Sequence, residues 1–447
     1  MTETVPAAGR SRWLALMVLC AGMLMIILDQ TIVNVALPEI QRDLGFSQAD
    51  LAWVVNAYLI AFGGLLLLSG RLGDLLGRRR LFVTGLAVFT AASVLCGLAG
   101  SQQLLVAARF VQGVGGAMAV AVALGMVVTL FPDPVERARA IGIYSFVAAA
   151  GASVGLLAGG VLTEALSWNW IFFVNIPIGL VAIVLARLLL AAERGIGLGA
   201  GADVLGAVTV TAGLMLGVYT IVKTTDYGWA SARTLGLGAV AIALLAGFVV
   251  RQATAANPLV PLRVFRSRQV FGANLVNVLT VGGMLSMFFL GVLYLQRVLD
   301  YDPMQTGLAF LPVAVTIAGL SVGLSARLNT RYGARNVMLV GLVLLLAGLL
   351  LLTQVPVDGR YAVDFLPSML LVGLGAGAFF PAVVTLAMSD ATADDSGLAS
   401  GLVNTSQQVG GALGLAVLAT VATGRTDRLL ASGQSLESAL TGGYQLA

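Results

Sequence analysis

The chain has 447 residues, of which 59% are hydrophobic and only 10% are charged, and its mean hydropathy is +0.97. This composition excludes a soluble globular protein, because a soluble fold of this size needs more polar surface than these residues supply. The net charge is only +4, and the sequence contains no histidine, which excludes histidine catalysis, histidine-ligated metals and a histidine proton relay.

Thirteen apolar runs are long enough to cross a hydrocarbon core of about 30 Å, which takes roughly 20 helical residues. The runs are continuous rather than alternating, so they predict membrane-spanning helices and not a β-barrel. We expect the first run to stay in place as a span, because it is too long for a cleaved signal peptide. In chain order, the runs lie at 13–37, 51–70, 80–98, 104–130, 138–162, 170–190, 204–222, 234–251, 271–295, 306–326, 336–354, 365–388 and 397–422.

The positive charges favour a cytoplasmic N-terminus. With that orientation, seventeen of the 25 lysines and arginines fall on the cytoplasmic side, as the positive-inside rule requires. The membrane topology therefore explains the excess of basic over acidic residues, and we expect no nucleic-acid partner. The loops between the runs are too short for a soluble catalytic domain, so the function must lie within the membrane.

The sequence also repeats itself at long range. Residues 70–80 after the second run are echoed by 325–335 after the tenth, and residues 113–160 are echoed by 373–414. Duplicated halves around a central cavity are typical of transporters that alternate access by rocking one half against the other. We therefore expect an all-α membrane protein with two pseudo-symmetric six-helix halves and two inserted helices between them.

The expected organisation has three parts. The first is an N-terminal six-helix bundle at 1–195, and the second is the inserted pair of helices at 196–255. The third is a C-terminal bundle at 256–447, in which we expect five of six helices. The chain ends at about the position where a fourteenth span is expected to begin, so we expect that last span to be missing.

Three polar residues inside the apolar runs predict a proton-coupling site. Asp29 lies more than halfway along the first run, where a carboxylate costs at least a few kcal/mol unless it is protonated, paired or facing water. Arg109 lies in the fourth run, and Gln112 follows one turn later on the same helix face. The two runs cross in opposite directions, so Asp29 and Arg109 fall at similar depth and we expect them to interact. The alternatives are a structural, hydrogen-bonding aspartate and a static buried ion pair.

A short basic turn between the second and third runs is the predicted cytoplasmic gate. Its glycines, Gly73 and Gly77, permit a sharp reversal of the chain, while Asp74 can interact with a helix N-terminus or with Arg78 or Arg79. Such contacts would break and re-form in each transport cycle. Simple anchoring by positive charge is the alternative, and it explains the arginines but not the aspartate.

Other polar and aromatic side chains are weaker candidates for lining a substrate cavity, because each is more often a helix-packing residue than a substrate contact. No acid lies in the membrane in the second half. The candidates are Asn34, Asn56 and Tyr58 in the first half, and Asn277, Met284, Phe288, Phe379, Phe380, Asn404 and Gln408 in the second, where Tyr294 and Gln296 are polar residues of the same kind.

Together these motifs resemble the 14-span drug:proton antiporter family of the major facilitator superfamily, often called the EmrB/QacA type, and the resemblance covers essentially the whole chain. The segments that carry it are the cytoplasmic-loop signature at 70–80, the proton-coupling motif at 109–113, the first-span motif at 28–38, and the characteristic segments at 168–179 and 203–206.

Two positions depart from the family pattern. The fifth run has Gly155-Leu156 where the family normally has Gly-Pro, so the proline-linked helix geometry associated with exporters is absent. Asn56 stands where some relatives carry an acid, which argues against strong selection for multivalent cations and leaves a neutral or monovalent amphipathic substrate at least as well supported.

The expected function is that of a proton-coupled exporter of hydrophobic or amphipathic small molecules, as in multidrug efflux and antibiotic resistance. Asp29 would carry the proton and Arg109 would be its electrostatic partner. We expect a monomer in a bacterial inner membrane, in contact with substrate, protons and lipids, with no enzyme activity, cofactor or metal. The alternatives are a proton-coupled carrier for a single metabolite or lipid and, less favoured, a non-transporting membrane sensor or scaffold, which gives no reason for a buried aspartate and arginine.

Overall fold

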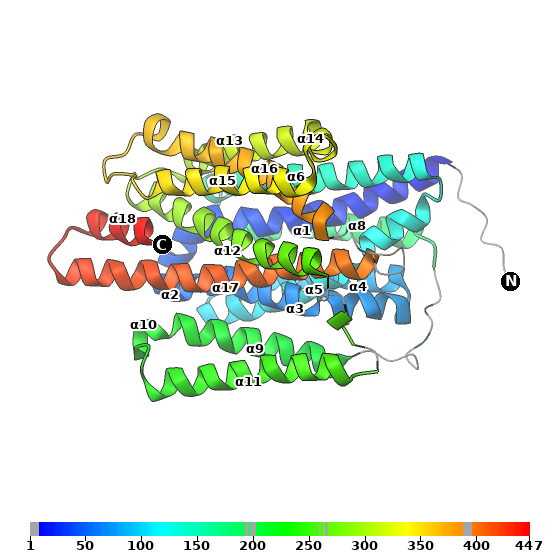
Figure 1. Cartoon of the computed structure of the whole chain (residues 1–447), viewed down its shortest axis with the longest axis horizontal. Coiled ribbons are helices and arrows are strands. Elements are labelled where there is room, and N and C mark those ends of the chain that lie inside the picture. Colours follow the sequence, from blue (N-terminus) through cyan, green and yellow to red (C-terminus); the bar gives the residue numbers. More distant parts are fainter. Residues whose placement is uncertain are drawn as a thin grey trace.

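The structure is a computed structural model, and it describes residues 9–192, 195, 197, 203–256, 258–260, 262–263, 267–387 and 396–447. Figure 1 shows a bundle of long helices that run side by side. The helices are α1 (Gly9–Leu44), α2 (Gln48–Leu51), α3 (Trp53–Leu76), α4 (Arg78–Gly97), α5 (Gln102–Leu130), α6 (Pro134–Ala165), α7 (Trp170–Phe173), α8 (Asn175–Leu189), α9 (Val204–Val222), α10 (Thr224–Tyr227), α11 (Ala232–Thr254), α12 (Arg268–Arg297), α13 (Pro303–Gly323), α14 (Ser325–Tyr332), α15 (Ala334–Leu352), the π-helix η3 (Tyr361–Phe365), α16 (Leu366–Ala387), α17 (Ser396–Ala431) and α18 (Leu436–Leu446).

Twelve helices of the described part of the chain are long and apolar enough to cross a membrane, and they coincide with twelve of the thirteen predicted runs. The remaining run, 138–162, lies within α6, where many side chains are outside the described residues. The first helix is longer than predicted, because it continues through Pro38 to Leu44. Proline is tolerated within membrane helices, because neighbouring helices, hydroxyl side chains, water or local adjustments can satisfy the backbone groups that it frees.

The helices pack in two groups. In the first group, α1, α3, α4, α5, α6 and α8 contact one another, and in the second, α12, α13, α15, α16 and α17 do so. The groups meet where α3 packs on α17, α6 on α13 and α1 on α12. Segments that are far apart in the sequence therefore form one shared core, with α3 near its centre.

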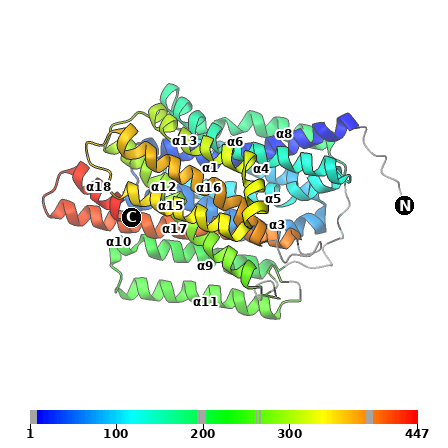
Figure 2. The ribbon, with the colours of Figure 1, turned by 45° about the horizontal axis from the view of Figure 1, so that its top comes forward.

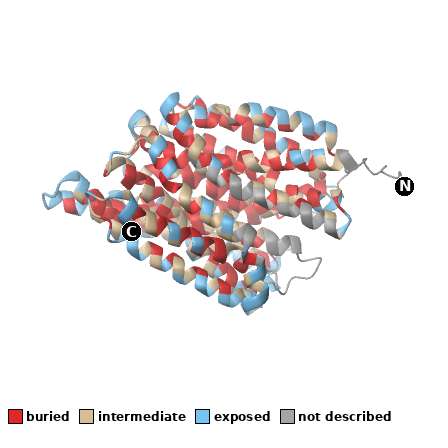
Figure 3. Cartoon of the chain, turned by 90° about the horizontal axis from the view of Figure 1, so that it is seen from above, coloured by how far each residue is buried: buried red, intermediate tan, exposed pale blue. Residues whose placement is uncertain are grey.

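The helices α9 and α11 form a separate layer on one side of the bundle, seen along the lower edge in Figures 1 and 2. The inner helix, α9, packs on both α3 and α17, and so touches both groups, while α11 packs chiefly on α9. In the most apolar 18-residue stretch of each span, 83% of the residues are buried in the span that contains α3, but only 11% in α11. The outer face of α11 is thus left for lipid. Figure 3, which views the bundle from above, shows exposed residues along the outer helices and buried residues between them.

Glycines allow some helices to approach to backbone contact, which is the usual way that membrane helices associate. A Cβ atom added to Gly115 on α5 would lie 2.5 Å from the backbone nitrogen of Phe89 on α4. A Cβ atom added to Gly341 on α15 would lie 2.8 Å from the carbonyl oxygen of Gly375 on α16. The same kind of close crossing therefore occurs in both groups of helices.

The two echoed segments of the sequence have the same local geometry. One residue, Gly77, separates α3 from α4, and its φ is 99° with ψ 128°. One residue, Gly333, separates α14 from α15, and its φ is 81° with ψ 139°. Positive φ values are accessible to glycine at little steric cost, so both reversals require this residue.

We call the end of the bundle where α1 begins the near end, and the end where α1 stops, at Leu44, the far end. At the far end, the Gln296 Nε2 atom donates to the Val35 carbonyl oxygen at 3.0 Å, which joins α12 to α1. Gly160 of α6 packs against the backbone of Pro303 and Met304 at the start of α13, so closely that a Cβ atom there would lie 2.7 Å from the Pro303 carbonyl oxygen. The two groups of helices are therefore in direct contact at this end.

Candidate functional site

The polar centre of the first group of helices is a buried ion pair between α1 and α5. The Arg109 Nη1 atom lies 2.5 Å from the Asp29 Oδ2 atom, and the exposed fractions of the two side chains are 1% and 0%. The Gln112 Nε2 atom donates to Asp29 Oδ1 at 2.8 Å, and the Gln112 Oε1 atom accepts from Arg109 Nη1 at 2.6 Å. The structure thus brings together the three residues that the sequence analysis assigned to proton coupling.

The Arg109 guanidinium is held on its other sides by α3 and α7. Its Nε atom donates to the Val54 carbonyl oxygen at 2.9 Å, and its Cζ atom lies 4.5 Å from the centre of the Tyr58 ring. The Phe172 ring centre is 5.8 Å from the same atom. These contacts offset the cost of removing a permanent cation from water. Tyr58, which the sequence analysis named as a weak cavity candidate, is therefore part of the ion-pair site.

Two further residues complete the site, and neither was predicted from the sequence to have a role there. Asn175, the first residue of α8, donates from Nδ2 to Asp29 Oδ1 at 2.9 Å. The Ser93 hydroxyl of α4 accepts from Gln112 Nε2 at 2.8 Å and donates to the Phe89 carbonyl oxygen at 2.9 Å. Asn175 lies in the segment 168–179, whose only signal in the sequence is its family resemblance. No sequence pattern distinguished Ser93.

The hydrogen bonds at Asp29 fit an ionised carboxylate. Among the described residues, Asp29 accepts bonds from Arg109, Gln112 and Asn175 and donates none. A carboxylate is an acceptor only, whereas a protonated carboxyl group needs an acceptor for its own hydrogen. A proton that arrives at Asp29 would neutralise the charge that holds Arg109, so this site can convert protonation into a change of contacts among α1, α5 and α8.

The predicted gate residues lie together at the near end of α3 and α4. The Gly77 amide donates to the Gly73 carbonyl oxygen at 2.9 Å, and the Arg78 Nη2 atom lies 3.3 Å from Asp74 Oδ1. The Arg79 Nη2 atom donates to the carbonyl oxygen of Arg187 at the end of α8, at 2.7 Å. Within the described part of the chain, these interactions stay inside the first group of helices.

The predicted cavity residues do not gather around one pocket. Within the described residues, Asn34 donates only to carbonyl oxygens of its own helix, while Asn277 donates to the Val403 carbonyl oxygen at 3.2 Å. Asn56 is fully buried, and neither atom of its amide has a hydrogen-bond partner among the described residues. The Phe379 side chain is buried against that of Phe380. The other four are partly buried within the bundle: Met284, Phe288, Asn404 and Gln408.

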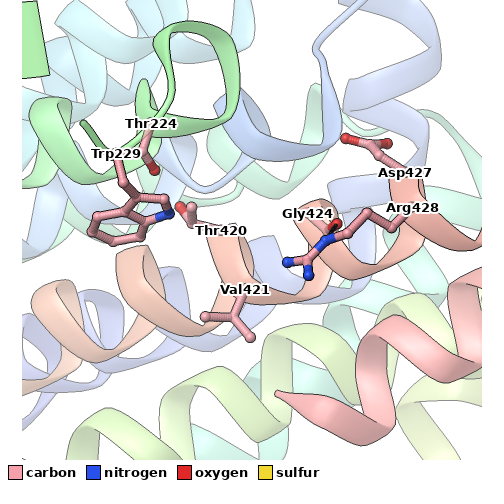
Figure 4. Close-up of a pocket in the computed structure, with 7 residues that line it drawn as sticks. All are labelled: Thr224, Trp229, Thr420, Val421, Gly424, Asp427 and Arg428. Atoms are coloured by element: carbon pink, nitrogen blue, oxygen red, sulfur yellow. Dashed lines mark hydrogen bonds between the residues drawn. The ribbon is translucent and has the colours of Figure 1, made fainter. Parts of the chain in front are cut away.

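The larger of two described cavities lies away from all of these candidates. It measures about 330 Å³ and opens between the α10–α11 connection and the second half of α17, as Figure 4 shows. The smaller cavity, of about 200 Å³, lies beside α12 and α18; Tyr294, named above as a polar residue of the same kind, lines it, but none of the ten cavity candidates does. The residues that line the larger cavity are Thr224, Trp229, Thr420, Val421, Gly424, Asp427 and Arg428.

Comparison with known sequences shows a match to the Major Facilitator Superfamily over residues 19–415. The puromycin resistance protein pur8 of Streptomyces alboniger is 40% identical over 442 residues, which are 98% of this chain and 88% of that protein. The cephamycin export protein CmcT of Amycolatopsis lactamdurans is 39% identical and covers 91% of this chain and 84% of its own length. The tetracenomycin C resistance and export protein of Streptomyces glaucescens is 36% identical and covers 94% of this chain and 78% of its own length.

Solved structures show the same fold. A bacterial homolog of the human lysosomal transporter Spinster, in an inward-facing and unoccupied conformation, superposes with a TM-score of 0.71 at 16% identity, over 98% of this chain and 94% of that chain. A mutant form of the nucleoside transporter NupG superposes with a TM-score of 0.66 at 13% identity, over 97% of both chains. At these identities, the likeness concerns the arrangement of the helices.

Proposed function

Because the chain belongs to the Major Facilitator Superfamily, and is therefore a multi-pass membrane transporter and not an enzyme, we propose that it exports hydrophobic or amphipathic small molecules in exchange for protons. Relatives that align over nine-tenths or more of the chain are named for resistance to puromycin and for export of cephamycin and tetracenomycin C. These names support export of antibiotic-like molecules through a bacterial cytoplasmic membrane.

The observation that carries proton coupling is the buried contact between Asp29 and Arg109, at 2.5 Å. The attraction between their opposite charges holds this carboxylate and guanidinium together in a site with almost no exposure. Protonation of Asp29 removes the negative charge and therefore the attraction. The affinity for the proton therefore depends on how the helices are arranged, which is the condition for coupling two events. Each inward proton supplies about 2.3 kcal/mol per 100 mV of membrane potential, in addition to any pH gradient.

The proposed membrane arrangement is that of the 14-span antiporter family with a cytoplasmic N-terminus. In it, the near end faces the cytoplasm, and α9 and α11 are the two helices inserted between residues 1–195 and residues 256–447. The contact of α9 with both α3 and α17 supports its placement as an addition to the side of a two-part bundle. The turn that contains Asp74, Gly77 and Arg78 would then be the cytoplasmic gate, acting chiefly through the position of α3 relative to α4.

A transport assay with matched variants tests the proposal. Inverted vesicles are acidified inside, and proton release is recorded on addition of each member of a panel of dyes and antibiotics. We expect release with the native chain and none with Asp29→Asn. The control is Asp358→Asn, which makes the same chemical change at an exposed aspartate after α15, outside the ion-pair site and both described cavities. Equal release from native and Asp29→Asn vesicles would show that Asp29 does not carry the proton.

A second candidate is a proton-coupled carrier that is specific for one compound, and the relatives named for a single antibiotic favour it. A relative named multidrug resistance protein Stp, from Mycobacterium tuberculosis, is 34% identical over 92% of this chain and favours a broad exporter. Ligand breadth separates the two functions. Thermal stabilisation of the purified protein by many unrelated amphiphiles supports broad efflux, whereas stabilisation by one compound supports the specific carrier.

A further inference from the structure

Asn175 is the residue of α8 that contacts the Asp29 carboxylate. Its side chain is completely buried, and its Nδ2 atom donates to Asp29 Oδ1 at 2.9 Å and weakly to the Ser93 hydroxyl at 3.4 Å. Its Oδ1 atom has no hydrogen-bond partner among the described residues. A buried amide oxygen without a partner is unfavourable, so the position calls for a reason why an asparagine stands there.

The reason follows from what Asp29 needs when it takes up a proton. The new O–H group is a donor, and it requires an acceptor inside the site. The Gln112 Oε1 atom already accepts from Arg109 Nη1 at 2.6 Å and faces the Cys96 thiol at 3.7 Å. The Ser93 hydroxyl oxygen already accepts from Gln112 Nε2 at 2.8 Å. Among the side chains that contact Asp29, Asn175 alone carries an acceptor atom with no partner in the described structure.

We propose that Asn175 is the positioning residue that senses the protonation state of Asp29, by presenting its amide nitrogen to the carboxylate and its amide oxygen to the acid. Rotation of the amide by about half a turn around the last side-chain bond exchanges the two atoms, which have nearly the same size. The proton stays on Asp29, and no covalent bond of Asn175 forms or breaks. This inference rests on the proposed role of Asp29 as the proton carrier.

The other charged and titratable groups around the site cannot take this role. The charged group that contacts the Asp29 carboxylate is Arg109 of α5, which is a donor in both states. Tyr58 of α3 accepts from Gln30 at 3.3 Å, and its ring lies against Arg109. Cys96 of α4 faces Gln112. Asn175 is also the first residue of α8, which packs on both α1 and α4, so a change in its hydrogen bonds acts on a whole helix.

The test is an equilibrium titration of purified protein in detergent by pH-difference infrared spectroscopy, which requires no transport. The carbonyl band that disappears in Asp29→Asn reports the protonated form of Asp29. In Asn175→Leu, which keeps the branched shape of the side chain but is larger and has no polar atoms, the carboxylate loses a charge-assisted bond and the acid loses a neutral one. Because the charge-assisted bond is stronger, we expect the midpoint of the Asp29 titration to move by about one pH unit to the alkaline side in this variant. That shift is a tenfold rise in proton affinity.

The spectrum supplies a second readout that a purely structural role would not change. If Asn175 accepts from the acid, the Asp29 carbonyl band in Asn175→Leu moves to higher frequency, as expected for an acid whose O–H has lost its acceptor. Asn175→Ala should move the midpoint in the same direction, and it serves as the second variant if leucine prevents folding. The control is Asn274→Leu, which removes a buried amide from α12 that bonds to the Val270 carbonyl and to Ser406.

Each outcome decides the question. An alkaline shift with the band displacement in the Asn175 variants, and neither change in Asn274→Leu, supports the proposal. A folded Asn175 variant with the native midpoint and band position overturns it, while leaving Asp29 as the proton carrier. Absence of any band that depends on Asp29 in the native protein overturns both this inference and the role of Asp29 in the proposed function.

Discussion

Replacement of Arg109 by methionine would leave the Asp29 carboxylate in the core without its cation, since both side chains are almost completely buried. Removal of one partner of a buried ion pair typically costs about 3–5 kcal/mol, because the remaining charge loses both its counter-ion and its hydration. The methionine keeps much of the volume that packs against Tyr58 and Phe172, so the cost should come chiefly from the charge. We expect Asp29→Leu alone to be destabilising for the same reason.

The double variant, Asp29→Leu with Arg109→Met, is the informative member of the series. With both charges gone, no uncompensated ion remains, so the double variant should lose no more stability than the single variant Arg109→Met. The coupling energy between the two positions would then be about 3 kcal/mol or more. The free energy of unfolding is measured by titration with sodium dodecyl sulfate in mixed micelles, followed by circular dichroism.

The control pair is Asp74 and Arg78, which lie 3.3 Å apart at the near end, with side chains 46% and 32% exposed. An exposed pair one helical turn apart is worth only about 0.3–0.5 kcal/mol and weakens as salt is added. The coupling between Asp29 and Arg109 should not change with salt. Additive effects of the two buried substitutions would refute the reasoning, because they would show that the two charges do not stabilise each other.

Two further predictions concern packing and surface charge. Gly115→Ala should lower the melting temperature, because the new methyl group meets the backbone of Phe89, whereas Gly236→Ala has open space around it and should leave the melting temperature unchanged or raise it. The hydrogen bond to Asp226 raises the pKa of Lys223 above its usual 10.5, so its contribution to stability is complete below that pH and disappears as the pH rises through the folded-state pKa. Lys223→Gln should therefore lower the melting temperature at pH 7, and the difference from the native protein should shrink in strongly alkaline buffer; an equal difference at both pH values would contradict this account.

The two kinds of charge contact found here have different uses. The contact of Lys223 with Asp50 at 3.2 Å ties the end of α9 to α2 at the surface of the bundle. Screening by water and salt makes such contacts weak and easily remade. The contact of Asp29 with Arg109 is protected from water, so its strength depends on whether Asp29 carries a proton. This difference is why the buried pair, and not the surface pairs, is the proposed coupling site.

The amino-acid sequence predicted where the spans lie, that they are helices, and that Asp29 and Arg109 fall at similar depth. A long apolar run in lipid must form a helix, because its backbone groups find no other partners, so twelve described helices coincide with predicted runs. The opposite directions of two spans placed Asp29 and Arg109 at similar depth, and the cost of an unpaired charge made their contact the expected arrangement.

Which other side chains join Asp29 and Arg109 depends on how the helices pack, and this follows from the three-dimensional structure alone. Asn175 lies 146 residues from Asp29, and depth in the membrane is shared by many residues of every span. Whether two such residues meet depends on how each helix is rotated and which helices are neighbours, and packing over the whole bundle sets both. The same packing left Asn34 bonded to its own helix and the cavity candidates dispersed, because an apolar sequence fixes where a helix crosses the membrane but not which of its faces meets which neighbour.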